Sequence, residues 1–410
     1  MRKIITSSIL LLLLLPIAIK AQEKGIHFEH GLTWKEIKAK AKAENKFIFM
    51  DCFTTWCGPC KLMVQLVFPQ DTTGTFFNEH FINVKMQMDK AAADNPDVKL
   101  LYADAEKIAK EYGVHIYPTF LYFSPDGKLV HRIIGAIFDP TAFVGKSAEA
   151  LNPATQYYTL LEQFNAGHLT NPEDIYQLAL MAKHNDDGVH EPQLAAAYLA
   201  AQKDTFTAKN LQFIYTLTEH SKDNTFPFLL THGKGIDKIL GKGKTARLIQ
   251  DIALAEDNLP AGQPVDWKKK AASLAKKYPG YDKEIFARLH VTYFLATKNW
   301  QQLNTAMRAY IGAYPDDIEP YEMNAIANRV FDDCPDKTCL ATALDWSKMA
   351  LDKGDLSSVF TYSDLLYKTG RQQDAIQILE KLLQQKQIGQ EIVEEKLESM
   401  KKGEKTWSNP

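Results

Sequence analysis

The stretch WCGPCK at residues 56–61 decides the fold, because it places two cysteines at a change from strand to helix. The apolar run FIFMD at 47–51 predicts a buried strand. A Gly-Pro pair interrupts that strand, and a predicted helix follows over 61–67. Cys57 therefore falls at a helix N-terminus, where unpaired N–H groups and the helix dipole stabilise a thiolate. Cys60 lies one turn further on, close enough for a disulfide.

Two thiols in this arrangement predict a site of thiol–disulfide exchange, with Cys57 as the exposed nucleophile and Cys60 as the resolving thiol. A structural disulfide is one alternative, but it needs neither the Gly58-Pro59 spacer nor the preceding Trp56. Half of a zinc site is another, and it needs a second pair of ligands. We therefore expect a redox-active Cys57–Cys60 disulfide, with no metal and no cofactor.

Length and composition describe an ordinary globular protein of two or three domains. The chain has 410 residues, of which 45% are hydrophobic and 24% are charged. Its formal net charge is -2, so nothing favours nucleic acid or an anionic membrane surface as a partner.

Residues 1–21 have the pattern of a secretory signal peptide. Arg2 and Lys3 precede an apolar run at 9–15, and the small residue Ala21 precedes polar sequence. An uncleaved anchor is the alternative, but the apolar run is short for a membrane helix. We expect cleavage after Ala21, a periplasmic or secreted protein, and no stable insertion in a membrane.

The next part of the chain alternates between helix and strand signals. Helix, strand, helix, strand, helix, strand, strand and helix are predicted in that order, at 33–44, 46–54, 61–67, 81–86, 105–112, 119–123, 128–134 and 139–150. A polar segment at 90–103 is expected to be a loop or a short insertion. This order predicts an α/β domain over 22–150, a mixed sheet with helices on both faces.

Residues 30–150 resemble a thioredoxin domain. The resemblance covers about 30% of the chain and is carried by six features in the family's order: Asp51 six residues before the first cysteine, Trp56, the run CGPCK at 57–61, Lys85, Tyr117-Pro118-Thr119 and Gly135. Only the cysteine motif is specific by itself. The resemblance implies a thioredoxin fold and a protein-disulfide oxidoreductase.

The resemblance also implies two further catalytic residues. Asp51 is the buried acid that exchanges a proton with Cys60, and Lys85 is the neighbouring cation that tunes Asp51 by its charge. The alternatives are an ordinary carboxylate at the strand end and a solvated lysine. Cys52 points to the opposite face of the strand from Asp51, and we assign it no chemistry.

Substrate binding is implied for the residues around the cysteines and for the proline segment. Pro118 matches the family's cis-proline, whose turn leaves the backbone of Tyr117 free to pair with an extended substrate. A trans-proline that only starts the strand is the alternative. The implied substrate-binding residues are Trp56, Gly58, Pro59, Tyr117, Pro118 and Thr119.

The expected partners are a protein or peptide disulfide as substrate and a separate redox donor, since the chain has no electron-carrying membrane portion of its own. The Gly-Pro spacer resembles that of reducing family members. A disulfide oxidant or isomerase, and a non-catalytic scaffold that binds partners, remain alternatives.

Residues 151–410 predict an all-α domain. Strand signals end, and amphipathic helices follow one another, among them 172–183, 192–202, 208–219, 267–277, 283–296, 301–313, 319–331, 339–351, 357–369 and 372–384. Leu366, Gly370, Ala375 and Leu379 have tetratricopeptide-like spacing. A helical domain without repeats is the alternative. We expect this region to recruit a client or a redox partner.

Cys334 and Cys339 flank a Pro-Asp turn between two predicted helices. In an oxidising compartment we expect a structural Cys334–Cys339 disulfide. A second redox pair and two free thiols are the alternatives.

Overall fold

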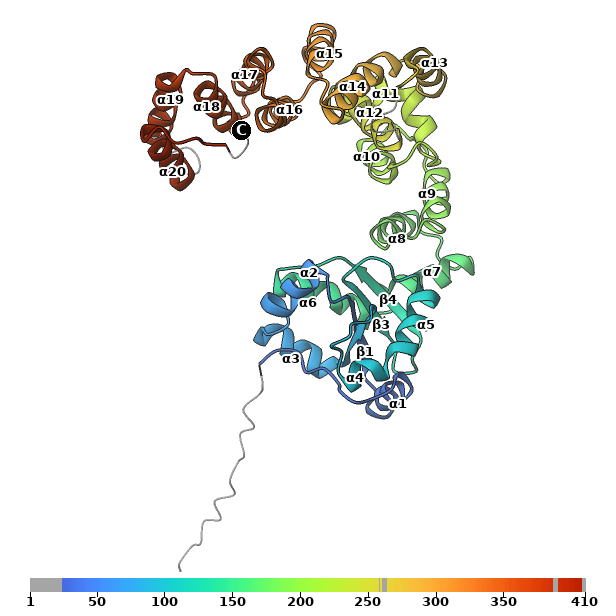
Figure 1. Cartoon of the computed structure of the whole chain (residues 1–410). Helices are drawn as coiled ribbons and strands as arrows, with labels where there is room; N and C mark the ends of the chain where they lie inside the picture. Colours follow the sequence, from blue (N-terminus) through green and yellow to red (C-terminus); the bar gives the residue numbers. More distant parts are fainter. Residues whose placement is uncertain (1–23, 258, 260–263, 386–389, 408–410) are drawn as a thin grey trace, which may run out of the picture. The chain divides into compact units, whose positions relative to one another are not determined.

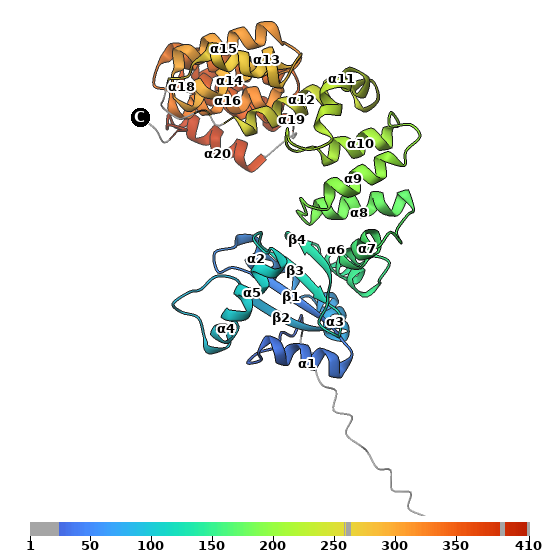
Figure 2. The same cartoon turned by 90° about the vertical axis from the view of Figure 1, so that its right-hand side faces the viewer.

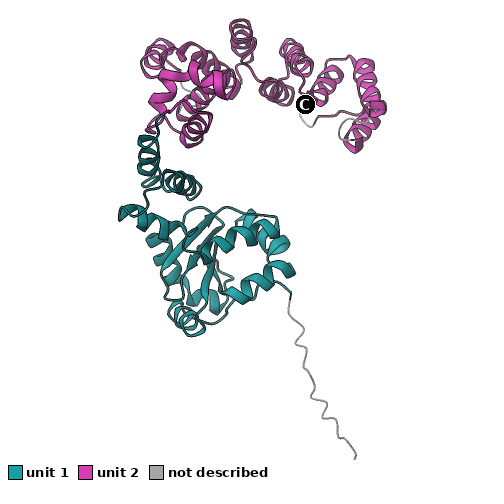
Figure 3. Cartoon of the chain, turned by 180° about the vertical axis from the view of Figure 1, so that it is seen from behind, with its two compact units in different colours: residues 1–203 teal, residues 204–410 magenta. Residues whose placement is uncertain are grey.

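The computed structural model describes residues 24–257, 259, 264–385 and 390–407. The predicted signal peptide at 1–21 lies outside the described residues. The chain divides into two compact units, residues 1–203 and residues 204–410 (Figure 3). The predicted domain boundary at 150 stays a prediction. Within the described residues, no helix has both the length and the apolar character that a bilayer crossing requires.

The first unit is built on a four-stranded mixed sheet, as the alternation of signals predicts (Figure 1). Its spatial order is β2-β1-β3-β4, where β1 is Phe47–Phe53, β2 is Phe81–Gln87, β3 is Thr119–Phe123 and β4 is Leu129–Ile134. Strand β1 runs parallel to β2 and antiparallel to β3, and β4 is antiparallel to β3. The central strand β1 therefore carries the chain directly to the cysteine motif.

Pairing register brings two of the predicted site residues together. In the parallel pair β1–β2, Asp51 lies opposite Lys85. Successive side chains of a strand point to opposite faces, so Asp51 and Cys52 diverge. Cys52 packs with the helices on the other face of the sheet, which confirms its predicted position.

Helices cover both faces of the sheet, which confirms the predicted layers (Figure 1). On one face Trp34 and Ile37 of α1 and Ile108 of α5 pack against the strands. On the other face Phe77 of α3 and Phe143 of α6 enclose a core rich in aromatic rings. The helices of this region are α1 Trp34–Glu44, α2 Gly58–Leu62, α3 Asp71–His80, α4 Pro96–Leu100, α5 Tyr102–Tyr112 and α6 Pro140–Ala148, followed by the 3-10 turn η2 Glu149–Leu151.

The helix after the cysteines differs in detail from the prediction. Helix α2 ends at Leu62 and continues as a π-helix, η1, over Met63–Val67. The segment at 90–103, predicted as a loop or short insertion, contains the short helix α4, because Asn95 caps it and Pro96 fits its first position.

Three helices follow the sheet within the first unit: α7 Tyr157–Asn165, α8 Pro172–His184 and α9 Glu191–Ala200. Helix α7 packs on β4, and α8 and α9 lie side by side (Figure 2). The backbone N–H of Tyr157 donates to Nδ1 of the buried His131 on β4, 3.1 Å away. This bond fixes the start of α7 on the sheet.

The second unit is entirely helical in its described residues, as the loss of strand signals predicts. Its helices are α10 Ala208–Leu217, α11 Phe226–Leu240, α12 Lys244–Glu256, α13 Trp267–Lys277, α14 Asp282–Ala296, α15 Trp300–Ala313, α16 Pro320–Asp333, α17 Lys337–Asp352, α18 Ser358–Lys368, α19 Gln372–Gln385 and α20 Gln390–Lys401.

The predicted repeat positions are core positions in the structure. Leu366, Ala375 and Leu379 are fully buried between α18 and α19, and Gly370 turns the chain between these helices with a φ of 92°. Only glycine adopts such a φ readily. The tetratricopeptide-like spacing is thus explained by packing.

The second unit also holds the remaining two cysteines. Cys334 follows the last residue of α16, and Cys339 lies in the first turn of α17. Both are buried free thiols, and the Cys334 thiol donates to the carbonyl oxygen of Asp336 at 3.9 Å. The disulfide predicted between them stays a prediction.

Candidate functional site

Cys57 and Cys60 form a disulfide at the start of α2, with Cα atoms 5.3 Å apart. Cys57 is the N-cap residue of the helix, and its sulfur accepts the backbone N–H of Cys60 at 3.1 Å. An N–H aimed at this sulfur stabilises negative charge on it. The predicted exposed nucleophile is nevertheless only 3% exposed in this disulfide form.

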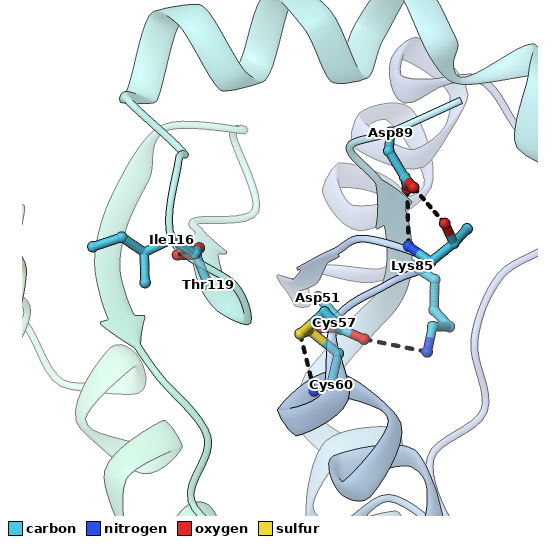
Figure 4. The surroundings of a disulfide bond; sticks show 8 residues. Asp51, Cys57, Cys60, Lys85, Asp89, Ile116 and Thr119 are labelled. Carbon is cyan, nitrogen blue, oxygen red and sulfur yellow. Dashed lines mark hydrogen bonds and ion pairs between the residues drawn. A yellow bond between two sulfur atoms is a disulfide. The ribbon is translucent and has the colours of Figure 1, made fainter. Parts of the chain in front are cut away.

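Asp51 lies on β1, two residues before the strand ends, and 2% of its surface is exposed. Burial raises the pKa of its carboxyl above the usual range, although the positive charge of Lys85 opposes this rise. The Lys85 Nζ lies 3.3 Å from Asp51 Oδ2 (Figure 4). The Asp51–Lys85 pair predicted from the sequence is therefore formed, and the role of its acid in proton transfer stays a prediction.

The Lys85 ammonium is surrounded by aromatic rings. Its Nζ lies 4.6 Å from the ring centre of Phe53, 5.3 Å from that of Phe28 and 5.4 Å from that of Phe68. Cations are attracted to the faces of such rings. The three phenylalanines, to which the sequence analysis gave no role, therefore keep the cation beside Asp51.

The proline segment leads into β3. The Tyr117–Pro118 peptide bond is cis, as the resemblance implies. Thr119 is fully buried, and its hydroxyl donates to the carbonyl oxygen of Ile116 at 2.7 Å (Figure 4). The Thr119 side chain holds the segment from inside, and the role of Thr119 in substrate binding stays a prediction.

Trp56 is the most exposed large apolar residue at the site, with 69% of its surface accessible. Its ring meets the Tyr117 ring edge-on, with centroids 5.9 Å apart. Gly58 and Pro59 are exposed beside it, and a Cβ added to Gly58 would meet no atom within 4 Å. These exposed residues flank the Cys57–Cys60 disulfide, and their role in substrate binding stays a prediction.

The sequence analysis also missed Asp89. Asp89 follows β2, and its carboxylate accepts the Thr55 backbone N–H at 3.0 Å and the Thr55 hydroxyl (Figure 4). Thr55 precedes Trp56, so Asp89 fixes the segment that presents the indole. The only feature of the sequence that could have indicated this role is an acidic residue just beyond the end of a predicted strand.

Comparisons with known proteins agree with this geometry. A family model described as a thioredoxin-like domain matches residues 34–149. Thioredoxin-2 of Pyricularia oryzae is 35% identical over 107 residues, which are 26% of this chain and 52% of that protein. The H-type thioredoxin of Chlamydomonas reinhardtii is 31% identical over 118 residues, 28% of this chain and 88% of that protein. The chain thus spans about half the length of the Pyricularia relative.

A solution structure of a proposed disulphide isomerase from Bacteroides thetaiotaomicron is 37% identical. The alignment covers 32% of this chain and 98% of that one, with a TM-score of 0.27. The family match contains the disulfide, Asp51 and Lys85, and it ends before the long helical region. The chain therefore belongs to the thioredoxin family, and its thioredoxin-like domain is of the thiol–disulfide oxidoreductase class.

Proposed function

We propose that the protein is an exported oxidoreductase that reduces disulfides of proteins or peptides through Cys57 and Cys60. The observation that carries the proposal is the closed cysteine pair at the start of α2, with the buried Asp51 on the adjoining strand. Export is supported by the signal-peptide pattern at 1–21. In that compartment disulfides persist, and a reductase has clients.

The reaction begins with the reduced protein. The Cys57 thiolate attacks one sulfur of the client disulfide, the client's sulfur–sulfur bond breaks, and its second sulfur leaves as a thiolate that takes a proton from water. Cys60 then loses its proton and attacks the Cys57 sulfur, which releases the first client sulfur. The client gains two electrons, and Cys57–Cys60 becomes a disulfide again. A separate dithiol donor must reduce it.

In this proposal Asp51 accepts the proton of Cys60. Burial raises the pKa of the Asp51 carboxyl, and a carboxylate with a raised pKa is a better base than an exposed one. Lys85, held by its aromatic neighbours, limits this rise. Lys85 is therefore a positioning residue that sets how strong a base Asp51 is.

The client is proposed to lie against Trp56 and Tyr117. Trp56 offers a large exposed ring, and the Tyr117 ring touches it. An extended client pairs its backbone with that of Tyr117, in the manner of an added strand. Gly58 leaves room for the client chain beside Cys57.

Insulin reduction by the full chain with a dithiol donor tests the assignment. Cys57→Ser is expected to lose the activity, and Cys60→Ser is expected to accumulate a mixed disulfide because resolution is blocked. Cys52→Ala removes a buried thiol on the opposite face of the sheet and serves as the matched control. An inert wild type, or activity that survives Cys57→Ser, would leave the scaffold alternative.

The direction of electron flow is tested by equilibrium with glutathione. A reduction potential below about −250 mV supports a reductase, whereas a value of about −120 to −180 mV is typical of oxidants and isomerases. Quantifying the alkylated Cys57 and Cys60 thiols by mass spectrometry gives the ratio of the two forms.

We further propose that the helices beyond the thioredoxin-like match recruit the client. Helical arrays present extended binding surfaces, which supports this role. A full chain carrying Cys57→Ser and Cys60→Ser is inactive but keeps those surfaces. In excess, it is expected to slow reduction of scrambled ribonuclease by the wild type and to leave reduction of glutathione disulfide unchanged. Equal effects on both substrates would contradict recruitment.

A further inference from the structure

We propose that the loop between α8 and α9, residues 185–190, contacts the bound polypeptide substrate, and that Asp186 positions the proline segment through His115. The inference rests on the proposed function and extends it to a specificity for polypeptide disulfides. His115 lies three residues before Pro118, and its Nε2 is 3.1 Å from Asp186 Oδ2. Residue 186 lies beyond the family match, which ends at 149.

The contact has the geometry of an ion pair. The other ring nitrogen of His115, Nδ1, lies 2.8 Å from the carbonyl oxygen of Gly113. Carbonyl and carboxylate oxygens only accept hydrogen bonds, so both contacts are satisfied when both ring nitrogens carry a proton. The side chains are 65% and 57% exposed, so the pair faces the solvent from which a substrate arrives.

The loop that carries Asp186 is itself fixed. The neighbouring Asp187 accepts the Tyr157 hydroxyl at 2.7 Å and the backbone N–H groups of Val189 and His190 at 3.2 and 3.0 Å. Asp186 has a φ of 52°, a left-handed conformation that Asp tolerates better than most residues. The Asp186 carboxylate is therefore presented to His115 by a defined backbone and not by a free chain.

Two other contacts hold the same segment from within the sheet. Arg132 of β4 donates through Nη1 to the Tyr112 carbonyl oxygen and through Nη2 to that of Gly113, at 3.1 and 3.3 Å. At the other end of the segment, the Thr119 hydroxyl donates to the carbonyl oxygen of Ile116. Between these ends, the segment is held from outside by Asp186. The loop between α8 and α9 thus touches the segment that is proposed to bind the client backbone.

This placement predicts a dependence on the size of the substrate. His115 lies two residues before Tyr117, and an extended polypeptide rises about 3.3 Å per residue, so a client chain that continues along this segment from Tyr117 reaches the His115–Asp186 contact within a few residues. A small disulfide occupies only the space at the sulfurs. The loop should therefore affect reduction of polypeptide disulfides and not that of small ones.

The test compares insulin with the small aromatic disulfide dithiobis(nitrobenzoate), using the full chain. Asp186→Asn removes the charge and tolerates the left-handed φ. It is expected to raise KM for insulin about two- to fivefold at unchanged kcat, the scale of an exposed ion pair, and to leave the small disulfide unaffected. Asp186→Glu should restore the insulin KM. Asp126→Asn, in the similarly exposed Lys42–Asp126 pair, is the control and should change neither substrate.

A second measurement locates the client directly. The Cys60→Ser chain is trapped as a mixed disulfide with a cysteine peptide that carries a photo-crosslinking residue three positions from the cysteine. Crosslinks to residues 185–190 are expected, and crosslinks confined to other residues would overturn the inference. An insulin KM unmoved by Asp186→Asn, or moved equally for both substrates, would also overturn it. If the wild type reduces neither substrate, the proposed function itself fails.

Discussion

Acidification should detach α7 from the sheet, because His131 is buried as a neutral ring. Its Nδ1 accepts the Tyr157 N–H, and a protonated Nδ1 can no longer accept it. Burial lowers the pKa of His131 to about 4, and the positive charge of Lys146 acts in the same direction. Glu149, with Oε2 3.9 Å from His131 Nε2, is the facing carboxylate.

The size of the effect follows from the difference between the folded and unfolded pKa. The folded value of about 4 lies below the ordinary 6.5, so between these pH values the unfolded state binds more protons. The contribution of neutral His131 is thus complete above pH 6.5 and is lost as the pH falls toward 4. At 1.36 kcal/mol per pH unit, the loss reaches about 3 kcal/mol.

The assay is urea unfolding of the full chain at pH values from 7 to 4. Pulsed hydrogen exchange, read on peptides covering β4 and α7, gives the free energy of unfolding of this unit. His131→Asn keeps an acceptor near the Nδ1 position without a titrating ring. On acidification its free energy of unfolding should therefore fall less than that of the wild type, and the difference should reach about 3 kcal/mol at pH 4. His184→Asn, at an exposed histidine, is the control. Parallel curves for the wild type and His131→Asn would refute the reasoning.

Three further outcomes are expected. Asp51→Asn should stabilise the protein at pH 7 by roughly 1–3 kcal/mol in urea unfolding. Burial raises the pKa of Asp51, so the ionised carboxylate costs stability as the pH rises above the ordinary carboxyl range. The gain from Asp51→Asn should therefore vanish in acid. Gly74→Ala should lose about 1–3 kcal/mol, since its Cβ would lie 2.3 Å from the Gly25 carbonyl oxygen. In an oxidising buffer, the predicted Cys334–Cys339 disulfide should make the peptide that contains residues 334–339 lighter by two hydrogens in mass spectrometry; a reduced mass would contradict it.

Much of the first domain could be predicted because its signals are local. The apolar run of β1 and the turn residues Gly58-Pro59 are consecutive in the sequence, and the strands follow one another along the chain in the predicted order. The change to a π-helix over Met63–Val67 has no such signal. Hydrophobic spacing places residues on a face, and it does not specify whether the hydrogen bonds span four residues or five.

The helices of residues 151–410 were harder to predict where tertiary packing outweighs the helix propensity of the residues. Helix α11, Phe226–Leu240, was not predicted, because it contains Gly233 and Gly235, which weaken an isolated helix. A Cβ at Gly233 would lie 2.1 Å from the Tyr281 hydroxyl, so the glycine is required by a neighbour 48 residues away. Helices α7, α12 and α20 were missed as well.

At the site, the sequence analysis found the cysteines, the acid and the lysine, which lie at fixed family spacings. It missed Asp89 and Asp186, because each acts on a loop far along the chain. A carboxylate bonded to a backbone N–H or to a histidine ring leaves no periodic pattern. Only the folded chain brings the partners together.

These two carboxylates act on the two segments that carry the Trp56 and Tyr117 rings. Asp89 holds Thr55, next to Trp56, and Asp186 holds His115, two residues before Tyr117. The centroids of the Trp56 and Tyr117 rings lie 5.9 Å apart, so in this proposal the placement of the two rings depends on both carboxylates. One anchor belongs to the thioredoxin-like domain and the other to the helices that follow it. A substitution in the α8–α9 loop can therefore alter which clients reach the sulfurs without changing any residue that takes part in the exchange.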